Sequence, residues 1–518
     1  MHESGRRVVR YQMVSFVVMR LLGGWLAKIP EYELKLEIGR HVWQDAQAAE
    51  ALRIRTGELR VPVDADRRPP VEIQRWLDML DQATTPLQFL VGIYRVAKPR
   101  LVSAMLLHMK STDPVCDAPT IRTLSPLVQE LGDQIRWGEA AIAAVASDDS
   151  AGLAAAATWQ AHLEEVLTEA GGLLAEGTPQ PPDPAAKDDG LASVPAARQP
   201  RSERMLVAAR DARFYIDLSP RLLPEDDDPP ELVELEEALA ERRRTSGRAA
   251  ESETHAPQGE HGQPPPVRLA QRDARFDMVS PPEQAQRMRP PGDDWVEKQR
   301  RLMHGMLDNE MHAAELSGRN SYEFPKMPWE FHLDMARVVW DEIRHSEETM
   351  KHLEELGGHI GMYPVVPGNF AYRIQLDLLH RLQDLHRRGE LNGLNGLLKS
   401  RNTFREMGDE TGALMMDYIQ ADETRHVAFG NRWVKWMLHE DPTKLKALAD
   451  EVEQQRQKHD QQVGALVKRA IGDSDNGASV PLAEGPIPIN VLSLRIAGFN
   501  DEEIAELVQK GGGNAALE

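Results

Sequence analysis

The sequence predicts an all-α protein built from two helical blocks, with a long irregular segment between them. Apolar residues recur at three- and four-residue spacings over residues 8–174 and again over 294–468, whereas the strict alternation of a half-buried strand is scarce. Between the blocks, proline-rich runs such as 179–184 and 261–266 cannot bury enough apolar surface to fold, which predicts a largely irregular linker. The expected divisions of the chain are 1–175, 176–291, 292–440 and 441–518.

The composition of the chain excludes several classes of protein. With 61 Lys and Arg against 82 Asp and Glu among 518 residues, the formal net charge is −21, so a nucleic-acid binder that works through a basic surface is not expected. The single cysteine, Cys116, rules out a disulfide framework, a thiolate zinc site and a thiolate-held iron–sulfur cluster. We expect a reducing, cytoplasmic environment and a buried position for this small side chain.

The N-terminal block contains the longest apolar stretch, residues 13–27. It is 15 residues long and carries Arg20 in its middle, whereas a bilayer requires about 20 apolar residues. Arg6 and Arg7 precede it as in a twin-arginine leader, but no small-x-small cleavage site follows before the charged stretch at Glu31. We therefore expect a buried helix, with neither a membrane span nor an export signal.

Two features interrupt the proline-rich linker. Residues 231–244 have the composition of a charged, exposed helix, and the string Arg-Asp-Ala-Arg-Phe occurs twice, at 210–214 and 272–276. A five-residue patch with a single aromatic residue suits docking of the linker onto a domain better than it suits chemistry.

Prolines divide the second block into helices. Pro325 and Pro328 bracket a short turn, Pro364 and Pro367 bracket a longer connection, and Pro442 starts a fifth helix. Short, long and short connections between four helices favour two antiparallel hairpins that pack as a four-helix bundle with one crossover. The four bundle helices are expected at 294–321, 328–357, 370–397 and 405–439.

The most informative feature is a five-residue string, Asp-Glu-x-Arg-His, that occurs at 341–345 and again at 422–426. A Glu-x-x-His pair alone occurs about as often as chance predicts, but two copies of the full string do not arise from composition. Residues three apart share a helix face, so the carboxylate and the imidazole of each copy can reach one point in a bundle core. A carboxylate and a neutral imidazole together suit Fe(II), Mn(II) or Zn(II). Each string would supply half of a metal site: Glu342 with His345, and Glu423 with His426.

A dinuclear carboxylate site also needs one glutamate from each of the two remaining helices. In a hairpin, residues at equal depth lie at similar distances from the turn. Glu310 lies 32 residues before Glu342, and Glu390 lies 33 residues before Glu423, so both hairpins place a glutamate at the same depth. Glu315 is the other candidate in the first hairpin, but it sits nearer the turn.

Charged residues at these positions could instead form salt-bridged faces on the helix surface. All six project from helices with apolar faces, however, and burying four carboxylates without cations costs several kcal/mol each. We therefore favour metal binding. Tyr418, five residues before Glu423, is expected to pack in the core and not to serve as a redox relay.

These motifs resemble those of the ferritin-like superfamily of diiron-carboxylate proteins. More narrowly, residues 310–436 are similar to an uncharacterised ferritin-like family, domain of unknown function 455. Met-Pro-Trp at 327–329 precedes the second bundle helix and Gly-Asp at 408–409 precedes the fourth, as is typical of that family. Ala-Gly-Phe at 497–499, followed by an acidic helix, is also similar.

The resemblance implies two iron ions, with manganese or another divalent metal as the alternative. It also implies hydrogen bonds that cross the bundle, from His426 to Asp341 and from His345 to Asp422, which would orient the two rings. Its implied ligands are Glu310 and Glu390 as terminal ligands, Glu342 and Glu423 as bridging ligands, and His345 and His426 as one imidazole for each metal.

The N-terminal block has the pattern of a second copy of the bundle. Residues 34–45 align with 331–342 without gaps, and residues 117–138 follow the pattern of 409–430. We expect two tandem ferritin-like bundles, of which the second alone binds metal, because most of the aligned side chains cannot ligate a cation and one is a lysine. The positions opposite the six expected ligands are Met13, Asp45, Ala48, Lys98, Leu131 and Gln134.

Two ions held in this way indicate an oxidase or oxygenase that activates O₂ and oxidises a small or carrier-bound organic substrate. An external electron donor is expected, because no glycine-rich stretch follows a strand pattern as a flavin or nicotinamide site requires. One alternative is a ferroxidase or iron-handling protein, although the fused architecture and long linker suit a cage poorly. Another is a non-catalytic, metal-stabilised scaffold. A homodimer is compatible with the sequence.

Overall fold

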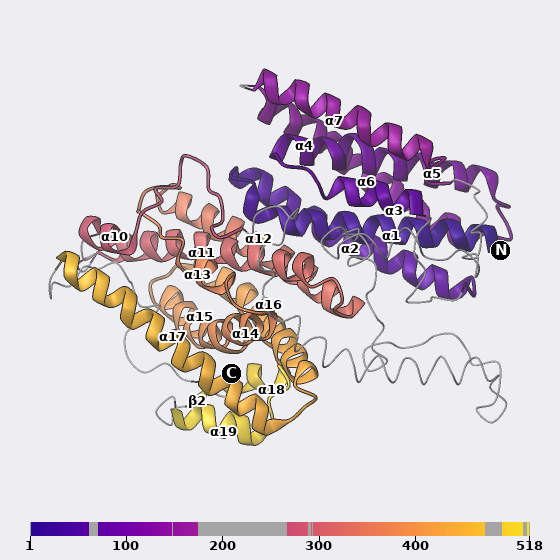
Figure 1. Cartoon of the computed structure of the whole chain (residues 1–518). Coiled ribbons are helices and arrows are strands. Elements are labelled where there is room, and N and C mark those ends of the chain that lie inside the picture. The colour runs from indigo at the N-terminus through magenta and orange to yellow at the C-terminus, as the bar shows by residue number, and fades with distance from the viewer. Residues whose placement is uncertain are drawn as a thin grey trace, which may run out of the picture.

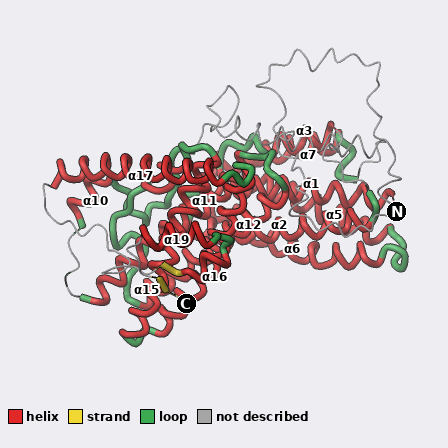
Figure 2. Tube along the Cα trace, turned by 90° about the horizontal axis from the view of Figure 1, so that it is seen from below, coloured by secondary structure: helices red, strands yellow, loops and turns green. Residues whose placement is uncertain are grey.

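The computed structural model describes residues 2–61, 71–147, 149–174, 267–288, 292, 294–471, 489–510 and 515–516. Within these ranges the protein is all-α, which confirms the predicted class, and its two named strands are two residues long each: β1 (Ile489–Asn490) and β2 (Ala515–Ala516). Figure 1 shows helices α1 to α7 on one side of the molecule and α10 to α19 on the other. Figure 2 shows the same division from below. The helix expected at 231–244 and the first Arg-Asp-Ala-Arg-Phe string lie outside the described residues.

The N-terminal half contains a hairpin of two long helices, α1 (His2–Trp25) and α2 (Tyr32–Glu58). Residues 14–27 are all buried, as expected for this apolar stretch. Among the helices in the described ranges, none is both long and apolar enough to cross a bilayer. The elements that pack beside the hairpin are η1 (Leu26–Lys28), α3 (Val71–Leu80), α4 (Pro86–Leu90), the π-helical segment η2 (Val91–Ala97), α5 (Lys98–Ser111), α6 (Ala118–Ala146) and α7 (Ser150–Glu169).

The C-terminal half contains a second hairpin of long helices, α11 and α12, and its final helices pack against α15 and α16. The start of the fifth helix at Pro442 agrees with the sequence. The elements of this half are α10 (Pro281–Arg287), α11 (Trp295–Glu323), α12 (Trp329–Glu355), α13 (Gly368–Arg373), α14 (Leu378–Asp384), the π-helical segment η5 (Leu385–Glu390), α15 (Leu391–Glu406), α16 (Glu410–Met437), α17 (Pro442–Ile471), α18 (Val491–Ile496) and α19 (Asp501–Lys510).

The helix expected at 370–397 is interrupted, so that part of the prediction is wrong. The Asp377 carboxylate accepts a hydrogen bond from the backbone N–H of His380 at 2.9 Å and so starts a new helix. The guanidinium of buried Arg381 donates to two carbonyls of the intervening turn, at 2.7 and 2.8 Å. Because side chains satisfy the backbone groups of the break, the chain loses little by leaving the helix there.

The fourth bundle helix starts later than the expected residue 405. Gly408 has a φ of 78° and ends α15 in the left-handed conformation that favours glycine at a helix C-terminus. Asp409 then caps α16, because its side chain accepts from the N–H of Gly412 at 2.8 Å.

The two halves meet through their hairpins, α1 on α11 and α2 on α12. At the first crossing, a Cβ added to Gly23 would lie 3.1 Å from the Cα of Gly318, so the two backbones touch. At the second, the side chain of Ile343 fills the space in which Gly39 has no Cβ. One cluster of buried apolar side chains runs from α1, α2, α5 and α6 into α11, α12 and α16. The halves therefore share a hydrophobic core.

The second Arg-Asp-Ala-Arg-Phe string, 272–276, docks onto both halves, as expected for this motif. Arg272 is buried and donates to Asp308 at 2.7 Å and to Glu315 at 2.6 Å, both on α11. Asp273 accepts a hydrogen bond from the first backbone N–H of α2 at 3.1 Å. The segment before α10 is thus fixed at the junction of the two hairpins.

Two smaller expectations are wrong. Cys116 is exposed, because it lies in the turn between α5 and α6. Tyr418 is 62% exposed and points away from the bundle core, since it lies on the outer face of α16.

The glycine contact between α1 and α11 predicts a position-specific response to added volume. Gly318→Ala places a methyl group against the carbonyl of Gly23, and we expect it to lower the free energy of unfolding by about 1–3 kcal/mol. Gly305→Ala is the matched control on the same helix, because a Cβ there meets no atom within 4 Å, and it should raise stability by up to about 1 kcal/mol. Chemical denaturation of both variants measures the difference; a Gly318→Ala variant as stable as the control contradicts the close approach.

Candidate metal centre

The six side chains predicted as ligands come together in the interior of the C-terminal half. They project from four elements, α11, α12, η5 and α16, and none is more than 8% exposed. The i, i+3 spacing within α12 and α16 places each glutamate and its histidine on one helix face. The residues are Glu310, Glu342, His345, Glu390, Glu423 and His426.

The six residues form two overlapping groups. Oxygen or nitrogen atoms of Glu310, Glu342, His345 and Glu423 all lie within 4.8 Å of one another, and so do atoms of Glu342, Glu390, Glu423 and His426. Glu342 and Glu423 belong to both groups, so each could contribute to two neighbouring cations. Each group could hold a metal ion, with three carboxylates and one imidazole as donors.

Unsatisfied polar atoms in the cluster fit a cation. Glu342 Oε1, Glu390 Oε1, Glu423 Oε2 and His426 Nδ1 are buried and make no well-aligned hydrogen bond within the described residues, although His426 Nδ1 lies 3.3 Å from Glu342 Oε1 and 3.8 Å from Glu423 Oε2. A buried carboxylate oxygen or ring nitrogen without a partner costs free energy. Divalent metal ions accept electron pairs from these same atom types, and would satisfy all four.

Without a cation, the cluster favours the protonated forms of Glu310, His345 and His426, because the pKa of each is raised. Burial and the neighbouring Glu342 and Glu423 carboxylates raise the pKa of Glu310 well above its ordinary value. Burial lowers the pKa of His345, but hydrogen bonds with Asp422, Glu342 and Glu423 outweigh it and raise that pKa well above 6.5. The pKa of His426 is raised in the same way, with Asp341 as its first partner. Protons therefore neutralise part of the charge that metal ions would otherwise balance.

Each histidine is oriented by an aspartate on the other Asp-Glu-x-Arg-His helix. His345 Nε2 lies 3.4 Å from Asp422 Oδ2, and His426 Nε2 lies 3.3 Å from Asp341 Oδ2. These contacts leave the Nδ1 atoms of both rings facing the glutamates. Outer carboxylates of this kind fix the orientation of ligating histidines in metal sites.

An arginine within the repeated string joins the two aspartates, a role that the sequence did not reveal. Arg344 Nη2 donates to Asp341 and to Asp422, at 2.6 Å in each case, and Arg337 donates to Asp341 at 2.7 Å. Burial raises the pKa of Asp341 and of Asp422, but hydrogen bonds from the histidine rings and from the arginines outweigh it and lower both pKa values. Arginine occupies the same position in both copies of the string, and this repetition was the signal in the sequence. Which aspartates Arg344 reaches depends on the packing of α12 against α16.

His386 is the second residue that the sequence reasoning missed. Its Nδ1 lies 2.6 Å from Glu390 Oε2, and its Nε2 is buried without a hydrogen-bond partner among the described residues. His386 and Glu390 both belong to the π-helical segment η5. The two residues are four apart, a spacing that places them on one face of an ordinary helix, so this i, i+4 pair was the available signal in the sequence.

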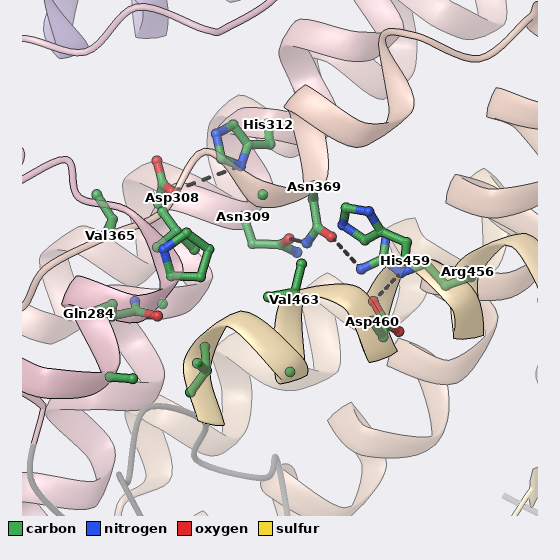
Figure 3. Close-up of a pocket in the computed structure, with 17 residues that line it drawn as sticks. Gln284, Asp308, Asn309, His312, Val365, Asn369, Arg456, His459, Asp460 and Val463 are labelled. Atoms are coloured by element: carbon green, nitrogen blue, oxygen red, sulfur yellow. Dashed lines mark hydrogen bonds and ion pairs between the residues drawn. The ribbon is translucent and has the colours of Figure 1, made fainter. Parts of the chain in front are cut away.

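Glu315, the alternative to Glu310, lies outside the cluster. It is fully buried and bound to Lys35 of α2 and to Arg272. A cleft of about 740 Å³ lies between α10, α11 and α17 (Figure 3), and none of the six clustered residues lines it. Asp308 and His312 line this cleft, whereas Glu310 projects from the opposite face of α11 because successive residues are about 100° apart.

Residues 225–470 match the model of a family described as protein of unknown function (DUF455). The match spans just under half of the chain and contains all six clustered residues. No curated protein and no solved structure matches the chain. The match supports the narrower of the two resemblances in the sequence, and the family's description assigns no activity.

Loss of an outer aspartate should weaken metal binding without removing a ligand. We expect Asp422→Asn to lower the affinity for Fe(II) or Co(II) about 10- to 100-fold, because the His345 ring loses its anionic acceptor. Asp417→Asn, on the same helix but at the surface beside Arg401 and Arg405, should leave the affinity unchanged. Anaerobic metal titration of both variants measures this, and equal affinities would exclude a supporting role for Asp422.

Metal binding should release protons, because the pKa values of Glu310, His345 and His426 are raised. Cations compete with these protons, so the apparent affinity should fall as the pH is lowered between about 8 and 6. Calorimetric titration in two buffers with different ionisation enthalpies counts the protons released. Heats that are the same in both buffers would contradict this linkage.

Proposed function

We propose that the C-terminal half binds two metal ions, with iron as the resident metal, and activates O₂ to oxidise a small or carrier-bound organic substrate. The observation that carries the proposal is the pair of overlapping ligand groups with Glu342 and Glu423 in common. Two adjacent redox metals supply the two electrons that O₂ chemistry needs, and hard carboxylate donors favour their higher oxidation states. This centre would be the resident cofactor of the chain.

The protein's own residues would position and insulate that centre. Four carboxylates offset the charge of two divalent ions, and the aspartate–arginine network holds the rings of His345 and His426 in one orientation. Burial of all six side chains excludes bulk water from the ligands. An external electron donor would complete the system. We also propose that the protein is cytoplasmic and that both bound metal ions are iron.

A substitution of a shared ligand tests the proposal. Glu342→Gln removes one donor from both groups, and we expect the affinity for each ion to fall by at least about 100-fold, the upper end of what loss of a supporting residue costs. O₂ consumption by the iron-loaded protein with a chemical reductant should be lost in parallel. Glu354→Gln, exposed on the same helix, is the matched control.

The outcome also separates the alternatives. O₂ uptake limited to the bound iron, with turnover only when reductant and an organic acceptor are present, supports the oxygenase proposal. Repeated oxidation of added Fe(II) with mineral formation would identify a ferroxidase instead. Tight metal binding without any O₂ uptake would identify a metal-stabilised scaffold.

A further inference from the structure

Equivalent residues of the two halves meet at their interface. The alignment of residues 34–45 with 331–342 has a constant offset of 297 positions, which pairs Trp43 with Trp340. These two indoles stack on each other, with ring centroids 6.0 Å apart and planes 8° from parallel. A residue that contacts its own counterpart lies on a two-fold axis. The stacked pair therefore locates such an axis between α2 and α12.

Contacts on either side of this axis are exchanged, as two-fold symmetry requires. Tyr32 and Trp329 are counterparts at the first positions of α2 and α12. Tyr32 Oη donates to the carbonyl of Ser346 on α12 at 3.0 Å, and Trp329 Nε1 donates to Glu50 of α2 at 2.6 Å. The two acceptors are counterparts within one residue. The first residue of each helix thus donates a hydrogen bond to the other helix, to a backbone carbonyl in one direction and to a side-chain carboxylate in the other.

The α1–α11 crossing follows the same rule. The carbonyls of Gly24 and Ser321 are counterparts at the offset of 297. Ser321 accepts from Arg20 of α1 at 2.7 Å, and Gly24 accepts from Arg319 of α11 at 3.2 Å. The donors Arg20 and Arg319 are not counterparts of each other, but the stacked tryptophans and the two exchanged pairs of contacts all lie along one junction between the hairpins.

The interior of the N-terminal half holds an ion pair at the place that corresponds to the acidic cluster. Lys98 Nζ lies 2.5 Å from Asp45 Oδ2 and 2.5 Å from Gln134 Oε1, and all three residues are no more than 2% exposed. Their counterparts in the alignment are Glu390, Glu342 and His426, three of the four residues in one ligand group. A π-helical segment stands at this point in both halves, η2 directly before Lys98 and η5 ending at Glu390.

We infer that the chain is a fused pseudo-symmetric dimer in which the ammonium group of Lys98 occupies the position of a metal ion in the N-terminal half. The comparison rests on the proposed function, because that proposal assigns Glu342, Glu390 and His426 as ligands. The N-terminal half then acts as a permanent partner subunit that supports α11 and α12. It contributes no second metal centre.

The charges agree with this assignment. One ammonium balances the one carboxylate that remains, Asp45, whereas Leu131 replaces the second shared carboxylate by an apolar group. Burial lowers the pKa of Lys98 and raises that of Asp45, and the attraction between them opposes both shifts. Glu130 also interacts with both charges and is hydrogen-bonded to Gln44, so within the ion pair itself the charges of Lys98 and Asp45 cancel.

Two substitutions of Lys98 test the inference. Lys98→Glu exchanges the ammonium for a carboxylate and places three oxygen donors, with Asp45 and Gln134, around the vacated position. We expect it to bind one Mn²⁺ per chain more than Lys98→Met, which removes the ammonium without adding a donor. Its thermal unfolding midpoint should rise with Mn²⁺ by more than that of Lys98→Met. Metal analysis after dialysis and thermal unfolding with and without Mn²⁺ give both readouts.

Mn²⁺ binding and folding of the two variants distinguish the outcomes. A folded Lys98→Glu protein that binds no more Mn²⁺ than Lys98→Met overturns the inference, and so does a Lys98→Glu protein that stays unfolded in Mn²⁺ while Lys98→Met folds. If neither variant folds, anomalous diffraction from Mn²⁺-soaked crystals of the native chain decides: a peak between Asp45 and Gln134 overturns the inference, and its absence there supports it. Because the two variants are compared with each other, failure of the C-terminal centre to bind metal would leave this test intact.

Discussion

Buried negative charge is the constraint on which the rest of this structure depends. Four carboxylates converge in the interior of the C-terminal half, where an unpaired ionised carboxylate costs several kcal/mol. Two histidines face them from inside, and two aspartates bound to Arg337 and Arg344 face the histidines from outside. The charges alternate outward from the centre, so three helices and one π-helical segment must keep a single arrangement to keep the cluster neutral.

Buried carboxylates are balanced by different positive groups in three parts of the molecule. At the junction of the hairpins, Arg272 and Lys35 balance Glu315 and Asp308. In the N-terminal half, Lys98 balances Asp45. In the C-terminal cluster no lysine or arginine reaches the glutamates among the described contacts, and protons on Glu310 and the histidines take that place. This difference distinguishes the candidate metal centre from the buried ion pairs elsewhere in the fold.

The N-terminal half supports the helices of the acidic cluster, independently of the chemistry of the C-terminal half. Its helices cover the two helices that carry Glu310, Glu342 and His345, through backbone contact at Gly23 and Gly318 and through stacking of Trp43 on Trp340. Close-packed interfaces of this kind transmit small displacements, because they have few voids in which to absorb them. The shared hydrophobic core therefore couples the position of the acidic cluster to the integrity of both halves.

The sequence by itself determined the helical class, the hairpin expected at 294–321 and 328–357, and five of the six side chains that converge; for the sixth it favoured Glu310 over Glu315 by distance from the turn. These properties depend on periodicity and on distance from a turn, which are local and can be counted along the chain. Only the tertiary structure decided that Glu315 pairs with Lys35 and so lies outside the cluster, that Arg344 reaches Asp422 on α16, and that the helix expected at 370–397 breaks around Arg381, which binds Glu323. Each of these depends on partners from distant segments of the chain, which the periodicity of a single helix does not record.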